Sequence, residues 1–204
     1  AMNEKGNPDT LYLDPVGTYD LELHTYPSIK KENIELVPGK HNIIALDVPA
    51  ADMNVNCMNA SFMNNNAQVL VRPKNNLKDI LNVQELNKSE KYLAADYRLE
   101  ILTTPETYID TSIIAFSQNQ FSIPNYGTLS IIADDKLLAD VYRVNNNMYE
   151  LVDRFEVNDN TENRKLQPGE YWIVYKSKAS YESESTKSQR FIIEEGRVAV
   201  INLQ

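Results

Sequence analysis

Polar and apolar residues alternate in short runs along this chain, and one alternating run occurs three times. Each copy begins with a small residue, one spacer and a tyrosine, and it continues with apolar side chains at every second position. The copies are 17–23, 95–101 and 169–175. Because strand side chains point alternately to two faces, each copy predicts a β-strand whose tyrosine leads the buried face.

The repetition extends beyond these strands. Tyr19, Tyr97 and Tyr171 are separated by 78 and 74 positions, and each copy is followed by an apolar run, a turn and a second apolar run. These paired runs are 34–37 with 43–48, 113–116 with 121–123, and 191–193 with 198–203. Repetition at nearly one period indicates tandem copies of one structural unit.

The same pattern predicts the fold class. Short runs rich in Val, Ile and Tyr recur about every ten residues, and no helix-length run has an apolar period of about 3.6 residues. We therefore predict an all-β fold of tandem antiparallel β-sandwich repeats, of the Ig-like or prealbumin-like kind. Residues 50–124 and 125–204 are the two predicted sandwiches. Residues 1–49 are predicted to be a partial leading unit whose strands pack on the first sandwich.

The leading tyrosines have a predicted role in this fold. The segment 166–171 resembles the tyrosine corner of β-sandwiches, in which a tyrosine at the start of a strand bonds its hydroxyl to the backbone a few residues upstream. A buried tyrosine needs such a partner. We therefore predict that Tyr97 and Tyr171 have buried rings and that each hydroxyl binds a nearby backbone group.

Composition and charge exclude several classes of function. The 204 residues, 42% of them apolar, are enough for two hydrophobic cores. A net charge of −9 argues against nucleic acid as a partner, because counterion release needs clustered Lys and Arg. The single cysteine forms no disulfide within the chain. No apolar stretch approaches the roughly 20 residues of a membrane helix, so we expect no membrane insertion by this segment. No export signal is visible at the start, as expected for a segment of a larger protein.

Two regions resemble known families. The run 19–49, with Pro-Gly-Lys-His-Asn-Ile-Ile at 38–44 and Asp-Val-Pro at 47–49, resembles the region after the von Willebrand factor A domain in envelope proteins of Bacteroidetes. The later copies, including 166–171 and 191–203, are similar to carboxypeptidase regulatory, or prealbumin-like, repeats of multidomain bacterial surface proteins. The resemblance implies a periplasmic or cell-surface location, with other domains of the same polypeptide or envelope proteins as partners. The metal motif of the A domain, Asp-x-Ser-x-Ser, is absent, so no metal site is carried over.

Residues that commonly carry chemistry are few and lack the required spacing. His24 and His41 are the only histidines, and neither has a partner at His-x-Glu or His-x-x-x-His spacing. No Gly-x-Ser-x-Gly elbow is present, and no cationic residue stands beside Cys57 in the sequence to activate its thiol. The segment 158–163 offers oxygen atoms to calcium, but it lacks the glycine and the distal glutamate of an EF-hand, so a solvated turn is favoured. We expect no enzyme activity, no catalytic or metal-binding residue, and no cofactor.

Trp172 departs from the repeat. It occupies the outward position that Asp20 and Arg98 hold in the other copies, and Val174 replaces Glu100 on the same face. An exposed apolar patch commonly marks contact with another chain, another domain or a ligand. The alternative is packing against a neighbouring unit or against the segment 178–189, because tandem units generally cover one another.

Trp172, Val174 and Tyr181 form the predicted interaction surface, with Tyr181 expected to fold over the indole. Two functions remain open. The first is a non-catalytic structural or protein-interaction module of a larger cell-envelope protein, and the second is a carbohydrate-binding module that uses Trp172, with Tyr142 and Tyr149 as further candidate rings. A sugar platform needs two or more coplanar exposed rings, so the orientation of the tyrosines beside Trp172 distinguishes the two hypotheses.

Overall fold

The computed structural model describes residues 12–14, 16–57, 68–146, 148–158, 161–179 and 186–203. Within these ranges every regular element is a β-strand, so the fold is all-β as predicted. The strands are β1 (Thr18–Leu23), β2 (Ile29–Glu35), β3 (Ala50–Asn56), β4 (Gln68–Pro73), β5 (Asn82–Glu85), β6 (Ser89–Leu93), β7 (Asp96–Ile101), β8 (Thr107–Ser112), β9 (Gln118–Ser122), β10 (Gly127–Ala133), β11 (Leu137–Asn145), β12 (Met148–Val157), β13 (Thr161–Leu166), β14 (Gly169–Ser177), β15 (Lys187–Ile193) and β16 (Val198–Leu203).

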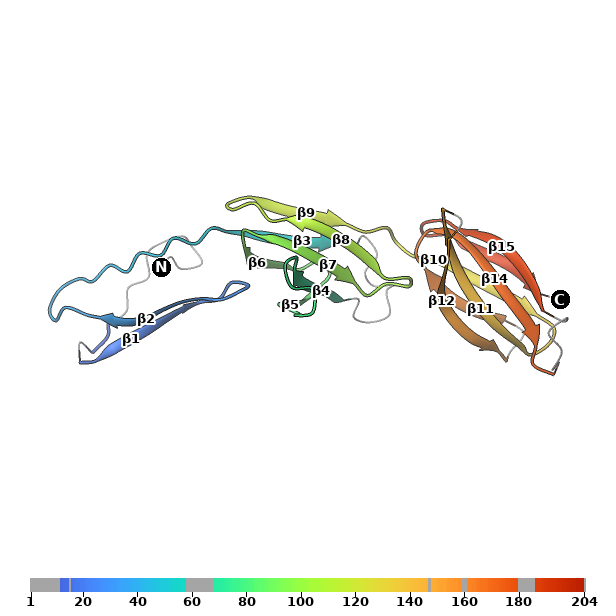
Figure 1. The fold of residues 1–204 in the computed structure, drawn as a ribbon, viewed down its shortest axis with the longest axis horizontal. Helices are drawn as coiled ribbons and strands as arrows, with labels where there is room; N and C mark the ends of the chain where they lie inside the picture. The colour runs from blue at the N-terminus through green and yellow to red at the C-terminus, as the bar shows by residue number, and fades with distance from the viewer. Residues whose placement is uncertain are drawn as a thin grey trace.

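Most of these strands form two sandwiches of identical topology (Figure 1). In the first, the sheets β6-β3-β9 and β5-β4-β7-β8 enclose one buried apolar core. In the second, the sheets β13-β10-β16 and β12-β11-β14-β15 enclose another. The order matches strand for strand, and the central strand of each smaller sheet pairs in parallel with the last strand of its unit. The prediction of tandem β-sandwich repeats is therefore confirmed.

The predicted tyrosine corners are present in both sandwiches. Tyr97 is 2% exposed and Tyr171 is fully buried. The Tyr97 hydroxyl donates to the carbonyl of Leu93 over 2.9 Å, and the Tyr171 hydroxyl donates to the carbonyl of Gln167 over 2.6 Å. Each acceptor lies four residues before its tyrosine, so the bond closes the turn that enters β7 or β14.

The leading unit differs from the expectation. We expected residues 1–49 to add strands to the first sandwich, with a hairpin of 34–37 and 43–48. Instead β1 and β2 pair with each other in a two-stranded sheet, and residues 41–49 form no strand. In the sandwiches the matching strands, β9 and β16, are held by a parallel partner, and the described part of the leading unit supplies no such partner. The unit boundaries at 49 and 124 remain a prediction.

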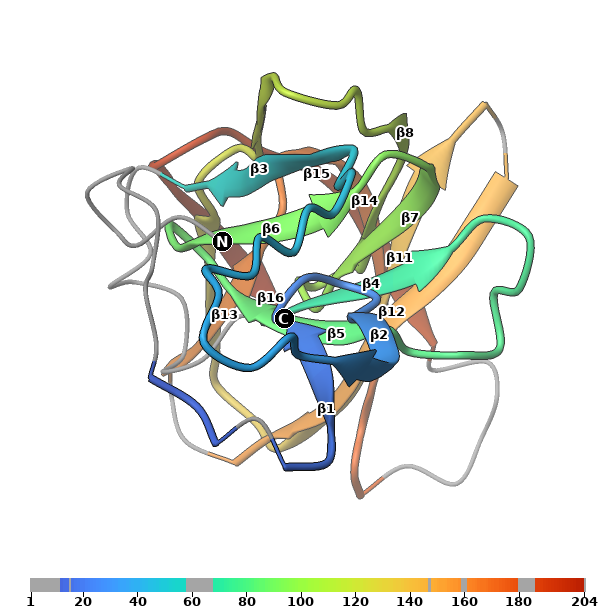
Figure 2. The same ribbon diagram turned by 90° about the vertical axis from the view of Figure 1, so that its left-hand side faces the viewer.

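The three parts follow one another in a row (Figure 1), and Figure 2 shows the same row from the end that holds β1 and β2. The first sandwich lies between the β1–β2 sheet and the second sandwich. The side chains of Tyr26 and Tyr126 both pack against the core of this middle sandwich. The chain is therefore an extended series of units with direct contacts between neighbours.

Phe116 occupies a backbone position that glycine holds in the other copies. Its φ is +60°, against +69° at Gly39 and +68° at Gly196. Gly39 and Gly196 lie in the turn between the two apolar runs of their unit, and Phe116, the last residue of the run 113–116, lies in the matching turn. The amides of Phe116 and Gly196 make matching bonds, to the carbonyls of Ala50 and Tyr126 over 2.9 and 3.1 Å. A bulky residue in this left-handed region is strained by roughly 1–3 kcal/mol. The ring is 81% exposed, so packing compensates little of that cost.

Changing Phe116 to Gly should raise the free energy of unfolding by roughly 1 kcal/mol, because glycine adopts a positive φ without strain. Changing Gly196 to Ala should lower it by a similar amount, since an added Cβ meets no atom within 4 Å and only the backbone conformation is disfavoured. Urea denaturation of both variants and the parent measures the differences. A Phe116→Gly protein less stable than the parent would show that the ring packs against the fold.

Stability should also fall in alkaline solution. Burial raises the pKa of Tyr171 from 10.0 to about 12. The folded chain therefore keeps a phenolic proton that the unfolded chain loses near pH 10, and this stabilisation is complete below pH 10 and is lost as pH rises through 12. Between pH 10 and 12, the free energy of unfolding of a Tyr171→Phe variant should fall by roughly 2–3 kcal/mol less than that of the parent. Parallel curves of unfolding free energy against pH for the two proteins would contradict the assignment.

Candidate interaction surface

Trp172 lies on the outer face of the sheet β12-β11-β14-β15. It stands on β14, directly between Tyr142 of β11 and Arg190 of β15 in the register of the sheet. The ring centroids of Tyr142 and Tyr149 lie 5.8 and 5.1 Å from that of the indole, with the ring planes tilted by 41° and 54°. Arg190 donates from Nη2 to the Tyr149 hydroxyl over 2.9 Å. We call these four side chains, Tyr142, Tyr149, Trp172 and Arg190, the aromatic face.

The aromatic face is accessible and continues into further apolar side chains. Trp172 is half-buried, while Tyr149 remains 47% exposed. Leu151 pairs with Tyr142 in register, and Ile192 lies on the same face of β15 one pair away from Arg190; both are exposed. Exposed apolar side chains on the edge strands β12 and β15 and half-buried ones on β11 and β14 therefore extend across one sheet, which is the pattern of a contact surface.

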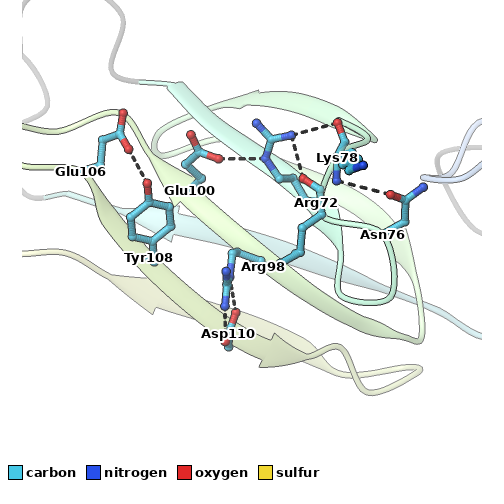
Figure 3. A network of polar contacts seen from close by, with 9 residues as sticks. Arg72, Asn76, Lys78, Arg98, Glu100, Glu106, Tyr108 and Asp110 are labelled. Carbon is cyan, nitrogen blue, oxygen red and sulfur yellow. Dashed lines mark hydrogen bonds and ion pairs between the residues drawn. The ribbon is translucent and has the colours of Figure 1, made fainter.

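The positions of the first sandwich that match Tyr142, Trp172 and Arg190 are charged (Figure 3). Arg98 holds the position of Trp172, and its neighbours in register are Arg72 and Asp110. The Arg98 guanidinium donates two hydrogen bonds to Asp110, over 2.7 and 2.9 Å, and Arg72 pairs with Glu100 at 2.8 Å. The bonds from Arg98 lower the pKa of Asp110 well below its ordinary range. A lattice of paired charges is typical of a solvated sheet face, so the two units share a backbone but not an outer surface.

The residues predicted for the interaction surface are partly brought together. Trp172 and Val174 lie on the same outer face, as expected, and Tyr142 and Tyr149 lie beside the indole. Tyr181 is outside the described residues, so the predicted cover by this side chain stays a prediction. Arg190 was missed, because only the pairing of β14 with β15 places it next to Trp172.

The candidates for catalysis or metal binding are not assembled into a site. His24 and His41 are exposed, and the described residues contain no group of three or more His, Cys, Asp or Glu that can hold a metal. Cys57 is buried, with its Sγ 3.5 Å from Asn125 Oδ1. The turn expected at 158–163 is partly strand, since β13 begins at Thr161; residues 159 and 160 are outside the described ranges. In the described part of the chain, no helix is long and apolar enough to cross a membrane.

Comparison with known proteins gives a distant likeness in structure. No family model and no curated protein matches the sequence. The minor pilin GBS52 of the Gram-positive pathogen Streptococcus agalactiae is 11% identical, with 76% of this chain and 94% of that chain covered and a TM-score of 0.41. The TIE protein of Bacillus anthracis is 15% identical, with 87% of this chain and 38% of that chain covered and a TM-score of 0.31. Scores this low carry no argument about function, and the resemblance to the region after a von Willebrand factor A domain stays a prediction.

Replacing Trp172 with Ser should lower the stability of the second sandwich by roughly 1–3 kcal/mol, because the half-buried indole contacts two tyrosine rings. The double change Trp172→Arg with Arg190→Asp should recover part of that loss. It places the charges of Arg98 and Asp110 at the matching register positions, where the first sandwich accommodates them. Urea denaturation of both variants tests this. A Trp172→Ser protein as stable as the parent would mean that the indole makes no stabilising contact.

Proposed function

We propose that the chain is a non-catalytic structural and protein-interaction module of a larger cell-envelope protein, and that the aromatic face is its contact surface. One observation carries the proposal. The register positions that Arg72, Arg98 and Asp110 hold in the first sandwich are occupied in the second by Tyr142, Trp172 and Arg190, which form a cluster with Tyr149. The first sandwich forms the same topology with charged residues at these positions, so the fold does not depend on aromatic ones there.

The composition of the aromatic face supports a protein partner. Trp, Tyr and Arg are the residues most enriched where binding energy concentrates in protein interfaces. Their exposed neighbours include Leu151 and Ile192, and the nearby charges of Asp140 and Arg154 are paired with each other. Apolar groups without an unpaired buried charge suit the centre of such a contact. The partner proposed here is another domain of the same polypeptide or another envelope protein, at the periplasmic or cell-surface location that the sequence resemblance implies.

The row of units supports the structural part of the proposal. Each contact between neighbours includes a backbone hydrogen bond, and the three parts lie along one axis (Figures 1 and 2). A series of this kind holds the outer face of its last unit at a distance from its first. Spacing and presentation of a contact surface need no catalytic residue.

Carbohydrate binding is the second candidate, and the exposed Tyr149 beside Trp172 is the observation that favours it. The ring geometry is less favourable. Tilts of 41° and 54° leave the tyrosines at an angle to the indole, whereas a flat sugar platform requires coplanar rings. The rings pack against one another as a tilted cluster, which is a common geometry between protein side chains.

Site-specific photo-crosslinking in cells that make the parent protein tests the protein-interaction function. A photoreactive phenylalanine at Tyr149 should give a discrete crosslinked product. The same group at Tyr108, an exposed tyrosine on the charged face of the first sandwich, is the matched control and should give none. The product from position 149 should disappear in the Trp172→Arg, Arg190→Asp background. Equal crosslinking from both positions, or none from either, would contradict the proposal.

The carbohydrate alternative is separated by fluorescence, because Trp172 is the single tryptophan of the chain and reports directly on this face. Titration with soluble β-glucan, xylan and mannan should leave the emission maximum and acrylamide quenching of Trp172 unchanged. A saturable blue shift with protection from quenching, abolished by Trp172→Arg with Arg190→Asp, would establish the carbohydrate function instead.

A further inference from the structure

The contact between successive units contains one hydrogen bond that occurs twice. Between the β1–β2 sheet and the first sandwich, the amide of Leu93 donates to the carbonyl of Tyr26 over 3.0 Å. Between the two sandwiches, the amide of Gln167 donates to the carbonyl of Thr104 over 2.8 Å. Leu93 and Gln167 each lie four residues before the corner tyrosine of their unit. Tyr26 and Thr104 each lie seven residues after the repeated tyrosine of their own unit, Tyr19 or Tyr97.

The acceptor side of the bond is built by the same turn in both cases. The sequence there is Thr-x-Pro, at 25–27 and 103–105. The hydroxyls of Thr25 and Thr103 donate to the carbonyls of Pro27 and Pro105, over 2.7 and 2.6 Å. Both threonines are buried, which leaves little freedom to the turn. The carbonyl of the middle residue, Tyr26 or Thr104, is thereby held toward the next unit.

The donor side is fixed by the corner tyrosine. The carbonyl of Leu93 accepts the hydroxyl of Tyr97, and the carbonyl of Gln167 accepts the hydroxyl of Tyr171. In each unit one residue, Leu93 or Gln167, therefore makes both bonds. Its carbonyl accepts the hydroxyl of the corner tyrosine of its own unit, and its amide donates to the preceding unit. Gln167 is only 3% exposed, so both bonds are shielded from water.

Side chains reinforce both contacts. The Tyr26 ring packs against the Tyr92 ring, with centroids 5.3 Å apart and planes tilted by 35°, at one end of the first sandwich. At the other end Tyr126 packs against the same core, and burial raises its pKa. Next to it, Cys57 Sγ of the first sandwich lies 3.5 Å from Asn125 Oδ1 of the second. A single hydrogen bond permits rotation of one unit about it, and these added contacts oppose that rotation.

We propose that these elements form a repeated inter-unit joint that holds successive units in one fixed orientation, and that the corner tyrosine is its positioning residue. The joint is a surface for one kind of partner: a β-sandwich unit that carries a corner tyrosine and presents the amide four residues before it. The proposal goes beyond the interaction function above, since none of its residues belongs to the aromatic face.

Residual dipolar couplings of backbone amides in the full chain test the joint. In the parent, one alignment tensor should fit the couplings of both sandwiches. In Tyr171→Phe, which keeps the ring but removes the hydroxyl bond to Gln167, each sandwich should still fit its own structure while the two require different tensors. Thr103→Val, which loosens the acceptor turn, should have the same effect and serves if the first variant does not fold.

Tyr108→Phe is the matched control. It removes another tyrosine hydroxyl bond, to Glu106 on the surface, and should keep a single tensor. Two tensors in the parent would overturn the proposal, because the units would then move independently. A single tensor in the folded Tyr171→Phe protein would also overturn it, since the joint would not depend on the tyrosine. Crosslinking from the aromatic face tests separate residues, so failure of one proposal leaves the other standing.

Discussion

The buried bond from a corner tyrosine to the carbonyl four residues upstream is the constraint on which the rest of the structure depends. It places an aromatic ring at the head of one of the two central strands of each larger sheet, where Tyr97 and Tyr171 are buried in the core of their unit. It also fixes the turn before that strand, and this turn carries the amide that reaches the preceding unit. One interaction thus connects the core of a unit to its neighbour. A buried hydroxyl without an acceptor would destabilise the core, so ring and turn are specified together.

The two sandwiches show how one framework supports two surfaces. Inward positions of the repeat keep their apolar character, because the core tolerates little change in volume. Outward positions are free of that requirement. There the first sandwich has Arg98 beside Asp110, and the second has Trp172 beside Arg190 at the matching positions. Phe116, in a place where the other copies have glycine, is a second such departure. Departures from a repeat at exposed positions are where specific contacts are expected, because they do not serve the fold.

Much of the fold follows from the sequence, and the failures have a physical cause. Strands with one buried face, such as β7 and β14, are predicted from the alternation of apolar and polar residues in their sequences. The strands β6, β8 and β13 lie at sheet edges and are mostly polar, so their sequences read as loops. The run 43–48 has a strand-like pattern but no pairing partner in the described chain, and pairing is a property of tertiary structure. Trp172 is predicted from the sequence because it departs from the repeat. The place of Arg190 and the inter-unit bonds cannot be predicted in this way, because they depend on which strands and turns are neighbours in the fold.

Hydrogen exchange at the amides of Leu93 and Gln167 tests the central claim most directly, that the corner tyrosine and the inter-unit bond form one buried unit of structure. Both amides donate across a joint to a neighbouring unit. If the joint is as stable as the sandwiches, these amides exchange only when the whole fold opens, at the rate of core amides such as that of Leu99. Exchange at the rate of exposed turn amides, with the sandwich cores still protected, would show that the units are joined only by flexible chain and would contradict the account.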